Sequence, residues 1–277
     1  MNGHEGNPFG FLAHPAFSAI EPLVKERLSK LDHFPAPHEL RGLAHGIACA
    51  EPPWFDFAPQ ITAQVAAAGG FDRFIAQQAL VPTRSGSFHD LLGALVWLHF
   101  PALKRAVHRM QLARDVTGRG PVENAVTHFD ESGVLVLSSR RALFDSLWHL
   151  QWERVFWDER ALLPSTSRFI GFGHGLLDAL REPHPRLMGK ALFVQVRPQH
   201  LSLGGSELRG WLDRALAARL ASFLVEPACL HPLPVLGIPG WARAESPDYY
   251  RERGYFRVAR QRERLARAPA VLDLESC

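Results

Sequence analysis

Residues 88–108, FHDLLGALVWLHFPALKRAVH, constrain the fold more than any other stretch of the chain. Read as a helix, the stretch repeats apolar side chains at three- and four-residue spacing and carries almost no charge before Lys104. A helix without a charged face is typical of a protein interior, so we expect this one to be central and largely buried. Ser87 suits the position that caps its start. Pro101 should kink the helix or end its first half, because proline has no N–H to donate.

The rest of the chain predicts a helix-dominated α+β fold. At 277 residues, 47% of them hydrophobic, the chain can bury a sizeable core. Helical patterns are frequent, and short strands are indicated at residues 134–137 and 191–196. We therefore expect a single compact domain with a few short strands. Within it, residues 1–60 form a proline-rich segment with one helix that packs on a main body of residues 61–277.

Several local expectations follow from the same patterns. Residues 34–59 should be irregular because prolines recur there, and residues 80–87 should be a turn leading into the central helix. The tetrapeptide Asp130-Glu131-Ser132-Gly133 is typical of a tight turn between a helix and the strand that follows. Further helices are expected at residues 18–31, 141–150, 152–162, 168–181 and 207–224.

Composition limits the class of partner. The 31 basic residues are almost balanced by 28 acidic ones and are spread along the chain, so a net charge of +3 does not indicate nucleic-acid binding. No window approaches the roughly 18 apolar residues of a membrane-spanning helix, and the N-terminus lacks the pattern of a signal peptide. Cys49, Cys229 and Cys277 are too far apart for a zinc pattern. We expect a cytoplasmic protein.

Ordered blocks of the sequence resemble a known family. The blocks are VPTRSGSFHDLLGALVWLHFPALK, FDESG, GFGHGLLDAL, GKALFVQV and PVLGIPGW. Over about residues 78–257 they are similar to the bacterial domain-of-unknown-function family 3025. That family usually has Trp-His-Asp where this chain has Phe88-His89-Asp90, and Asn at the position of Gly93. The resemblance implies a cytoplasmic bacterial protein built as one unit, and it implies no activity.

Histidines and carboxylates supply the candidate chemistry. His89-Asp90 opens the apolar helix, where an unpartnered polar group costs about 1–3 kcal/mol and therefore needs a partner. His174 and Asp178 are four residues apart, so on a helix they share a face. We predict His89, Asp90, His174 and Asp178 as metal ligands, and we predict a catalytic set consisting of His89, Asp90, Asp130 and Glu131. Imidazole and carboxylate suit Zn, Mn or Fe. The leading hypothesis is a metal-assisted hydrolase that acts on an unidentified small molecule or protein.

Other interpretations remain open at this stage. The His and Asp residues could be structural in a binding or scaffold protein that docks a partner on the exposed aromatics Trp54, Phe55 and Trp241. The order of His45, His89, Asp90 and Asp178 also matches the H…HD…D order of the all-helical HD phosphohydrolases. In the enzyme hypothesis, the apolar loop at residues 234–241 should cover the opening beside His89 and His174.

Overall fold

The computed structural model describes residues 7–45, 54–113, 120–257 and 268–274. The helices are α1 (Pro22–Ser29), α2 (Pro37–Leu43), α3 (Thr62–Ala67), α4 (Phe71–Gln78), α5 (Phe88–His99), α6 (Pro101–Ala113), α7 (Pro121–Ser132), α8 (Arg141–Trp148), α9 (Leu163–Thr166), α10 (His174–Ala179), α11 (Pro198–Leu201) and α12 (Gly205–Phe223). The strands are β1 (Asp56–Pro59), β2 (Leu80–Thr83), β3 (Gly133–Ser138), β4 (Ser167–Gly171), β5 (Met188–Gln195), β6 (His231–Pro234) and β7 (Leu272–Asp273). The predicted helix-dominated α+β fold is confirmed.

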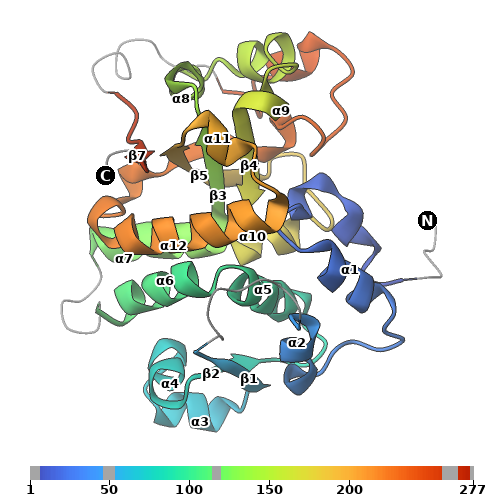
Figure 1. Cartoon of the computed structure of the whole chain (residues 1–277), viewed down its shortest axis with the longest axis vertical. Helices are drawn as coiled ribbons and strands as arrows, with labels where there is room; N and C mark the ends of the chain where they lie inside the picture. Colours follow the sequence, from blue (N-terminus) through green and yellow to red (C-terminus); the bar gives the residue numbers. More distant parts are fainter. Residues whose placement is uncertain (1–6, 46–53, 114–119, 258–267, 275–277) are drawn as a thin grey trace.

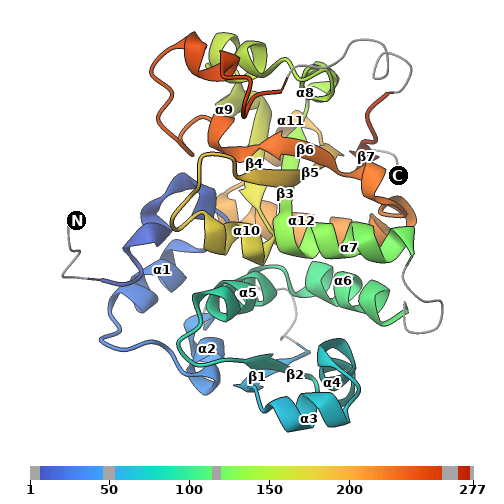
Figure 2. The ribbon, with the colours of Figure 1, turned by 180° about the vertical axis from the view of Figure 1, so that it is seen from behind.

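A five-stranded mixed sheet forms one half of the molecule. Its strand order is β4-β3-β5-β6, and β7 pairs with β5 as well. The neighbours β3 and β5 are parallel, whereas β4 and β6 run antiparallel to them. Every residue of β3 is buried, as its unbroken apolar run predicts for an internal strand. Figure 2 shows β6 beside β5, its antiparallel neighbour in the sheet.

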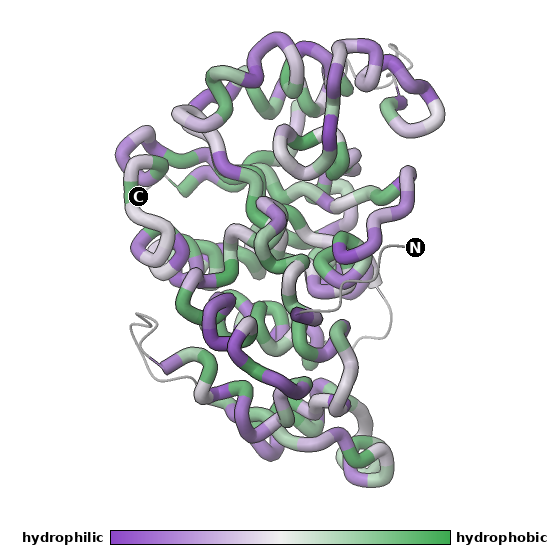
Figure 3. The backbone as a smooth tube through the Cα atoms, turned by 90° about the vertical axis from the view of Figure 1, so that its right-hand side faces the viewer, coloured by the Kyte–Doolittle hydropathy of each residue, from purple (hydrophilic) through white to green (hydrophobic). Residues whose placement is uncertain are grey.

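Two layers of helices lie on one side of the five-stranded sheet. Figure 1 shows α7, α12 and α10 next to the sheet, followed by α5 and α6. The layers are in contact because α12 packs against α6 and α10 packs against α5 and α7. Beyond α5 and α6 lies a small parallel sheet of β1 and β2, with α3 and α4 at its side. The tube in Figure 3 is most hydrophobic through its middle and more hydrophilic toward its outer turns.

Helix α5 is the buried central helix that its sequence predicts. Eight of its residues are buried, including Leu92 and Leu95 with no exposed area. The Ser87 hydroxyl accepts a hydrogen bond from the Asp90 N–H at 3.2 Å, which confirms the predicted cap. The helix ends at His99 and α6 begins at Pro101, so Pro101 does end the first half of the segment.

Several local expectations were wrong. The region expected to be irregular contains α2 and β1, and the expected turn at residues 80–87 begins with β2. The tetrapeptide at residues 130–133 is not a turn, since α7 continues through Ser132 and β3 starts at Gly133. Of the expected helix at residues 168–181, only His174–Ala179 is helical, because Ser167–Gly171 pairs with β3 as β4.

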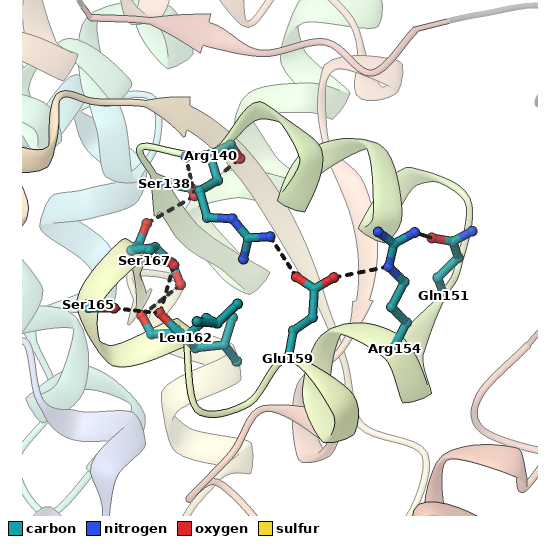
Figure 4. A network of polar contacts seen from close by, with 10 residues as sticks. Ser138, Arg140, Gln151, Arg154, Glu159, Leu162, Ser165 and Ser167 are labelled. Carbon is teal, nitrogen blue, oxygen red and sulfur yellow. Dashed lines mark hydrogen bonds and ion pairs between the residues drawn. The ribbon is translucent and has the colours of Figure 1, made fainter.

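The expected helix at residues 152–162 is replaced by a π-helical turn at Arg154–Asp158. Figure 4 shows how a polar network fixes this turn near the end of β3. The Glu159 carboxylate accepts hydrogen bonds from Arg140 at 2.9 Å and from Arg154 at 3.0 Å. Ser138, at the end of β3, accepts from the Arg140 N–H at 3.0 Å. The network ties the segment to the sheet far from the helical layers.

The described residues leave some sequence features untested. Cys49, Cys277 and residues 258–267 of the basic C-terminal run lie outside them. Within the described ranges, no helix has the length and apolar character needed to cross a membrane.

Candidate functional site

Three side chains from three helices meet beside α5. They are His89 in the first turn of α5, Glu131 near the end of α7, and His174 at the start of α10. One ligand atom from each lies within 4.8 Å of the others. The two imidazole rings are 4.6 Å apart between centroids and stand at 65° to each other. Two imidazoles and one carboxylate form a donor set that binds divalent transition metals.

A close contact between two chain segments brings α10 to the end of α7. The N–H groups of Phe172 and Gly173 both donate to the Gly133 carbonyl, at 3.0 and 2.9 Å. A Cβ at residue 173 would lie 2.3 Å from the Gly133 nitrogen, so only glycine permits this approach. A Cβ at residue 175 would lie 2.5 Å from Glu131 Oε2. Gly173 therefore allows the segments to meet, and Gly175 leaves space for the Glu131 carboxylate.

The orientation of His174 leaves one ring nitrogen available to a ligand. Its Nδ1 lies 2.9 Å from the Asp130 carbonyl oxygen, and since a carbonyl only accepts, Nδ1 carries the proton. The unprotonated Nε2 is 3.6 Å from Glu131 Oε1. Burial lowers the pKa of His174 below its usual value. The negative charge of Asp130 raises this pKa and the positive charge of Lys104 lowers it, but burial has the largest effect. The imidazole is therefore neutral at neutral pH, as metal ligation requires.

The Asp178 carboxylate lies close to the His89 ring. Its Nδ1 lies 3.8 Å from Asp178 Oδ2, which is ion-pair distance but longer than a hydrogen bond. Asp178 is held by Arg181, whose Nη1 donates to Oδ1 at 2.9 Å. The Arg181 guanidinium lies over the Phe88 ring, 3.6 Å from its centroid. Asp178 thus lies close to His89 but is not part of the three-donor group.

Asp130 is bound by a lysine. Lys104 Nζ lies 2.5 Å from Asp130 Oδ1, and both side chains are almost fully buried, with 5% and 12% of their area exposed. Burial alone would raise the pKa of Asp130, but the charge of Lys104 and its hydrogen bond outweigh it, so the pKa lies below its usual value. The side chain of Asp130 therefore faces α6, while its backbone carbonyl holds His174.

Asp90 is bound by an arginine. Both carboxylate oxygens take part, because Arg84 Nη2 donates to Oδ1 at 2.7 Å and Nε donates to Oδ2 at 3.0 Å. The Arg84 backbone N–H also donates to Oδ2 at 2.6 Å, and the Ser87 hydroxyl donates to Oδ1 at 3.1 Å. Burial opposes ionisation of Asp90, but these bonds outweigh it and lower its pKa. Asp90 consequently fixes the turn before α5 and lies outside the three-donor group.

Glu131 differs from the other three carboxylates. Asp90, Asp130 and Asp178 each pair with an arginine or lysine, at 2.7, 2.5 and 2.9 Å. Among the described residues, the one ion-pair partner of Glu131 is His174. Of these four carboxylates, Glu131 is thus the one whose charge no arginine or lysine neutralises in the described part of the chain.

The three donors open into a pocket of about 410 Å³ between the helices and the small sheet. Its wall includes Asp90, Gly93 and Asp130 together with residues that the sequence analysis did not single out for a site. These additional residues are Gln60, Phe71, Asp72, Val81, Pro82, Thr83, Arg84, Ala94, Trp97, Lys104 and Gln111. In the sequence, Lys104 lies three residues before Val107 on the apolar face of α6, and this was a signal because a charge on a buried face needs a partner.

The pocket wall contradicts one further expectation. Residues 234–241 do not line the pocket, so the prediction that this loop covers the opening was wrong. Trp241 is buried, with 4% of its area exposed, and its carbonyl oxygen is 3.0 Å from His14 Nε2. The loop therefore belongs to the core and contacts the N-terminal segment at His14.

The structure does not support either alternative in the form that the sequence indicated. Phe55 and Trp241 are buried, and Trp54 packs edge-on against Trp97, so these aromatics do not form an exposed docking surface. His45 is exposed and does not line the pocket. The four-residue HD set therefore does not form one site, and the five-stranded sheet also differs from an all-helical fold.

Comparison with known proteins places the chain in a family. No curated protein and no solved structure matches it. The model of the family described as "Protein of unknown function (DUF3025)" matches residues 55–260, a range that covers most of the chain and includes every residue of the pocket wall. The chain belongs to the DUF3025 family.

Proposed function

We propose that this protein is a metal-dependent hydrolase whose divalent ion is bound by His89, Glu131 and His174. The observation that carries the proposal is the meeting of these three donors at the wall of an open pocket. Structural zinc sites are closed by four protein ligands, whereas catalytic sites combine three ligands with an open position. Three donors facing a cavity of about 410 Å³ match the catalytic type.

Surrounding residues support the two histidines of the donor set. The Asp130 carbonyl fixes the tautomer of His174, as outer-shell groups do in metal sites, and the Asp178 carboxylate lies 3.8 Å from His89 Nδ1. Bonds of about 2.0–2.2 Å hold ligand atoms no more than about 4.4 Å apart, so small side-chain rotations would close the set around an ion. The Lys104–Asp130 pair secures the end of α7, which carries both Glu131 and the carbonyl that holds His174.

A bound ion would act as a Lewis acid and lower the pKa of a coordinated water toward neutrality, which provides a nucleophile for hydrolysis. The chain's own residues would hold the ion, exclude bulk water and position the substrate. The donor set suits Zn, Mn or Fe. The cytoplasmic location, the unidentified small-molecule or protein substrate, and the division of the chain at residue 60 stay predictions from the sequence.

Metal binding tests the proposal directly. We expect purified protein to bind about one equivalent of Zn²⁺, Mn²⁺ or Fe²⁺, measured by elemental analysis and by anaerobic calorimetric titration. His174→Ala and Glu131→Gln should each weaken binding by more than the roughly 10–100-fold typical of outer-shell changes, while Asp178→Asn should fall within that range.

His128→Ala is the matched control, because His128 is an exposed histidine on α7 that does not line the pocket. Its metal affinity should equal that of the wild type. Chelator-sensitive hydrolysis of nitrophenyl esters or phosphate esters, lost in His174→Ala, would establish the reaction class. Equal metal binding by the wild type and by all the variants would refute the site.

A further inference from the structure

Arg84 is positioned in the pocket wall by its neighbours. Asp90 binds the guanidinium through Nε and Nη2, and it also binds the Arg84 backbone N–H. The Asp90 side chain is only 10% exposed, whereas the Arg84 side chain is 57% exposed and lines the pocket. The guanidinium is thus fixed on its Asp90 side and open on the other.

The free edge of this guanidinium has donors to offer. Among the described residues, no acceptor bonds Arg84 Nη1, and the second hydrogen of Nη2 has none either. A flexible surface arginine would lose side-chain freedom when it binds a ligand, but Asp90 already holds this one in place. An arginine fork presented in this way matches the planar oxygens of a carboxylate or the oxygens of a phosphate.

Lys104, the second cation of the pocket wall, is less able than Arg84 to bind an anionic ligand. Lys104 is 5% exposed, and its ammonium group pairs with Asp130 and lies 4.9 Å from the centre of the Trp97 ring. The positive charge of Lys104 is therefore already neutralised by Asp130 inside the protein. Arg84 is the cation of the wall that a ligand in the pocket can reach.

We propose that Arg84 is the anion-binding residue of the pocket and that the substrate carries a carboxylate or phosphate group. The reaction in this inference rests on the proposed function: Arg84 would bind the anionic group of the substrate while the metal site acts on the scissile bond. Asp90 is a positioning residue, because it acts through Arg84. The proposal narrows the substrate to a small anionic ester, amide or phosphate ester.

Binding of inorganic phosphate and of acetate, measured by calorimetry on both metal-free and metal-loaded protein, tests the inference. Arg84→Gln should weaken binding of the preferred anion about tenfold or more, as expected for loss of a charge-assisted hydrogen bond. Its metal affinity should stay within about twofold of the wild type, because Arg84 lies outside the donor set. Preference for phosphate or for acetate identifies which anion the pocket takes.

Arg105→Gln is the control for a general loss of positive charge. Arg105 is exposed on α6 beside Lys104, its guanidinium lies over the Trp54 ring, and it does not line the pocket. Its variant should bind anions as the wild type does. Arg84→Lys should fold and keep the charge but lose the fork, so its anion affinity should fall by at least about threefold even if Arg84→Gln is unstable.

The outcomes separate this inference from the metal site. Anion binding that depends on Arg84 in a protein that binds no metal would support the anion site and refute the proposed function. Normal metal binding, with equal anion affinity in the wild type and in both Arg84 variants, would overturn the anion site and leave the metal site standing. Absence of any anion binding by the wild type would also overturn it.

Discussion

Replacement of Lys104 by methionine should destabilise the protein severely. Methionine keeps most of the volume of the lysine stem, so the substitution opens little space and chiefly removes the ammonium group. The Asp130 carboxylate, 12% exposed, would then be buried without the charge that lies 2.5 Å away in the wild type. Breaking a buried ion pair in this way costs about 3–5 kcal/mol. Loss of the contact with the Trp97 ring would add up to about 1 kcal/mol.

Urea denaturation followed by circular dichroism would measure the loss in free energy of unfolding. At pH 7 we expect about 3–6 kcal/mol for Lys104→Met, a large fraction of the 5–15 kcal/mol typical of a folded protein. The double variant Lys104→Met/Asp130→Asn should recover about 1–3 kcal/mol of that loss, since the unpaired charge has gone. Asp130→Asn alone completes the double-mutant cycle.

The pH dependence provides a second check on the same pair. In the wild type the pKa of Asp130 is lowered, so the stability that it contributes is present above its unfolded pKa and is lost as the pH falls. Without Lys104, burial raises the pKa of Asp130, and protonation in mild acid then relieves the variant. The difference between wild type and variant should therefore shrink as the pH falls toward 4. A loss below about 1 kcal/mol at pH 7, or a difference that grows in acid, would refute this account of the pair.

Three other substitutions test the surrounding helices. Leu92→Ala should cost about 2–5 kcal/mol in urea denaturation, because Leu92 is fully buried in α5; a loss of a few tenths would mean that α5 is peripheral. Burial lowers the pKa of His99 from 6.5 to about 4, so stability should fall by up to about 3 kcal/mol as the pH drops from 6.5 to 4. His99→Gln should flatten that decline, and an unchanged pH profile would assign it to other groups. Gly93→Ala should stabilise α5 by about 0.5–1 kcal/mol with unchanged metal affinity, since its Cβ would lie 3.7 Å from His174, at ordinary contact distance; reduced thermal stability would show that the space beside His174 is needed.

Local signals were sufficient to predict α5. The apolar spacing, the Ser87 cap and Pro101 all act within a few residues of the chain, and the structure has each of them where the sequence indicates. The amphipathic pattern of α12 was equally clear, and the helix is found at Gly205–Phe223 within two residues of the predicted bounds. Elements defined by their own periodicity can be predicted because their pattern depends on which face is buried rather than on the partner that buries it.

The wrong expectations arose where a distant contact decides the local structure. Residues 130–133 have the composition of a turn, but α7 passes directly into β3 because the Gly133 carbonyl binds the N–H groups of Phe172 and Gly173. Residues 167–171 became a strand through pairing with β3, in a stretch too short for its periodicity to distinguish strand from helix. Neither partner is visible in the local sequence.

The candidate site shows the same division between local and distant information. The sequence presents four carboxylates near the two histidines, and two of them have cations close by: Arg84 lies six residues from Asp90, and Arg181 lies three residues from Asp178. If the carboxylates in these two local pairs are set aside because an arginine already neutralises them, Asp130 and Glu131 remain as candidate metal ligands. Those two are adjacent on α7, so their side chains point about 100° apart and cannot both face the histidines. The packing of α6 on α7 decides between them, because Lys104 takes Asp130 and leaves Glu131 facing His174 at 3.6 Å. The identity of the candidate metal-binding carboxylate therefore follows from a helix pairing that joins residues 26 positions apart.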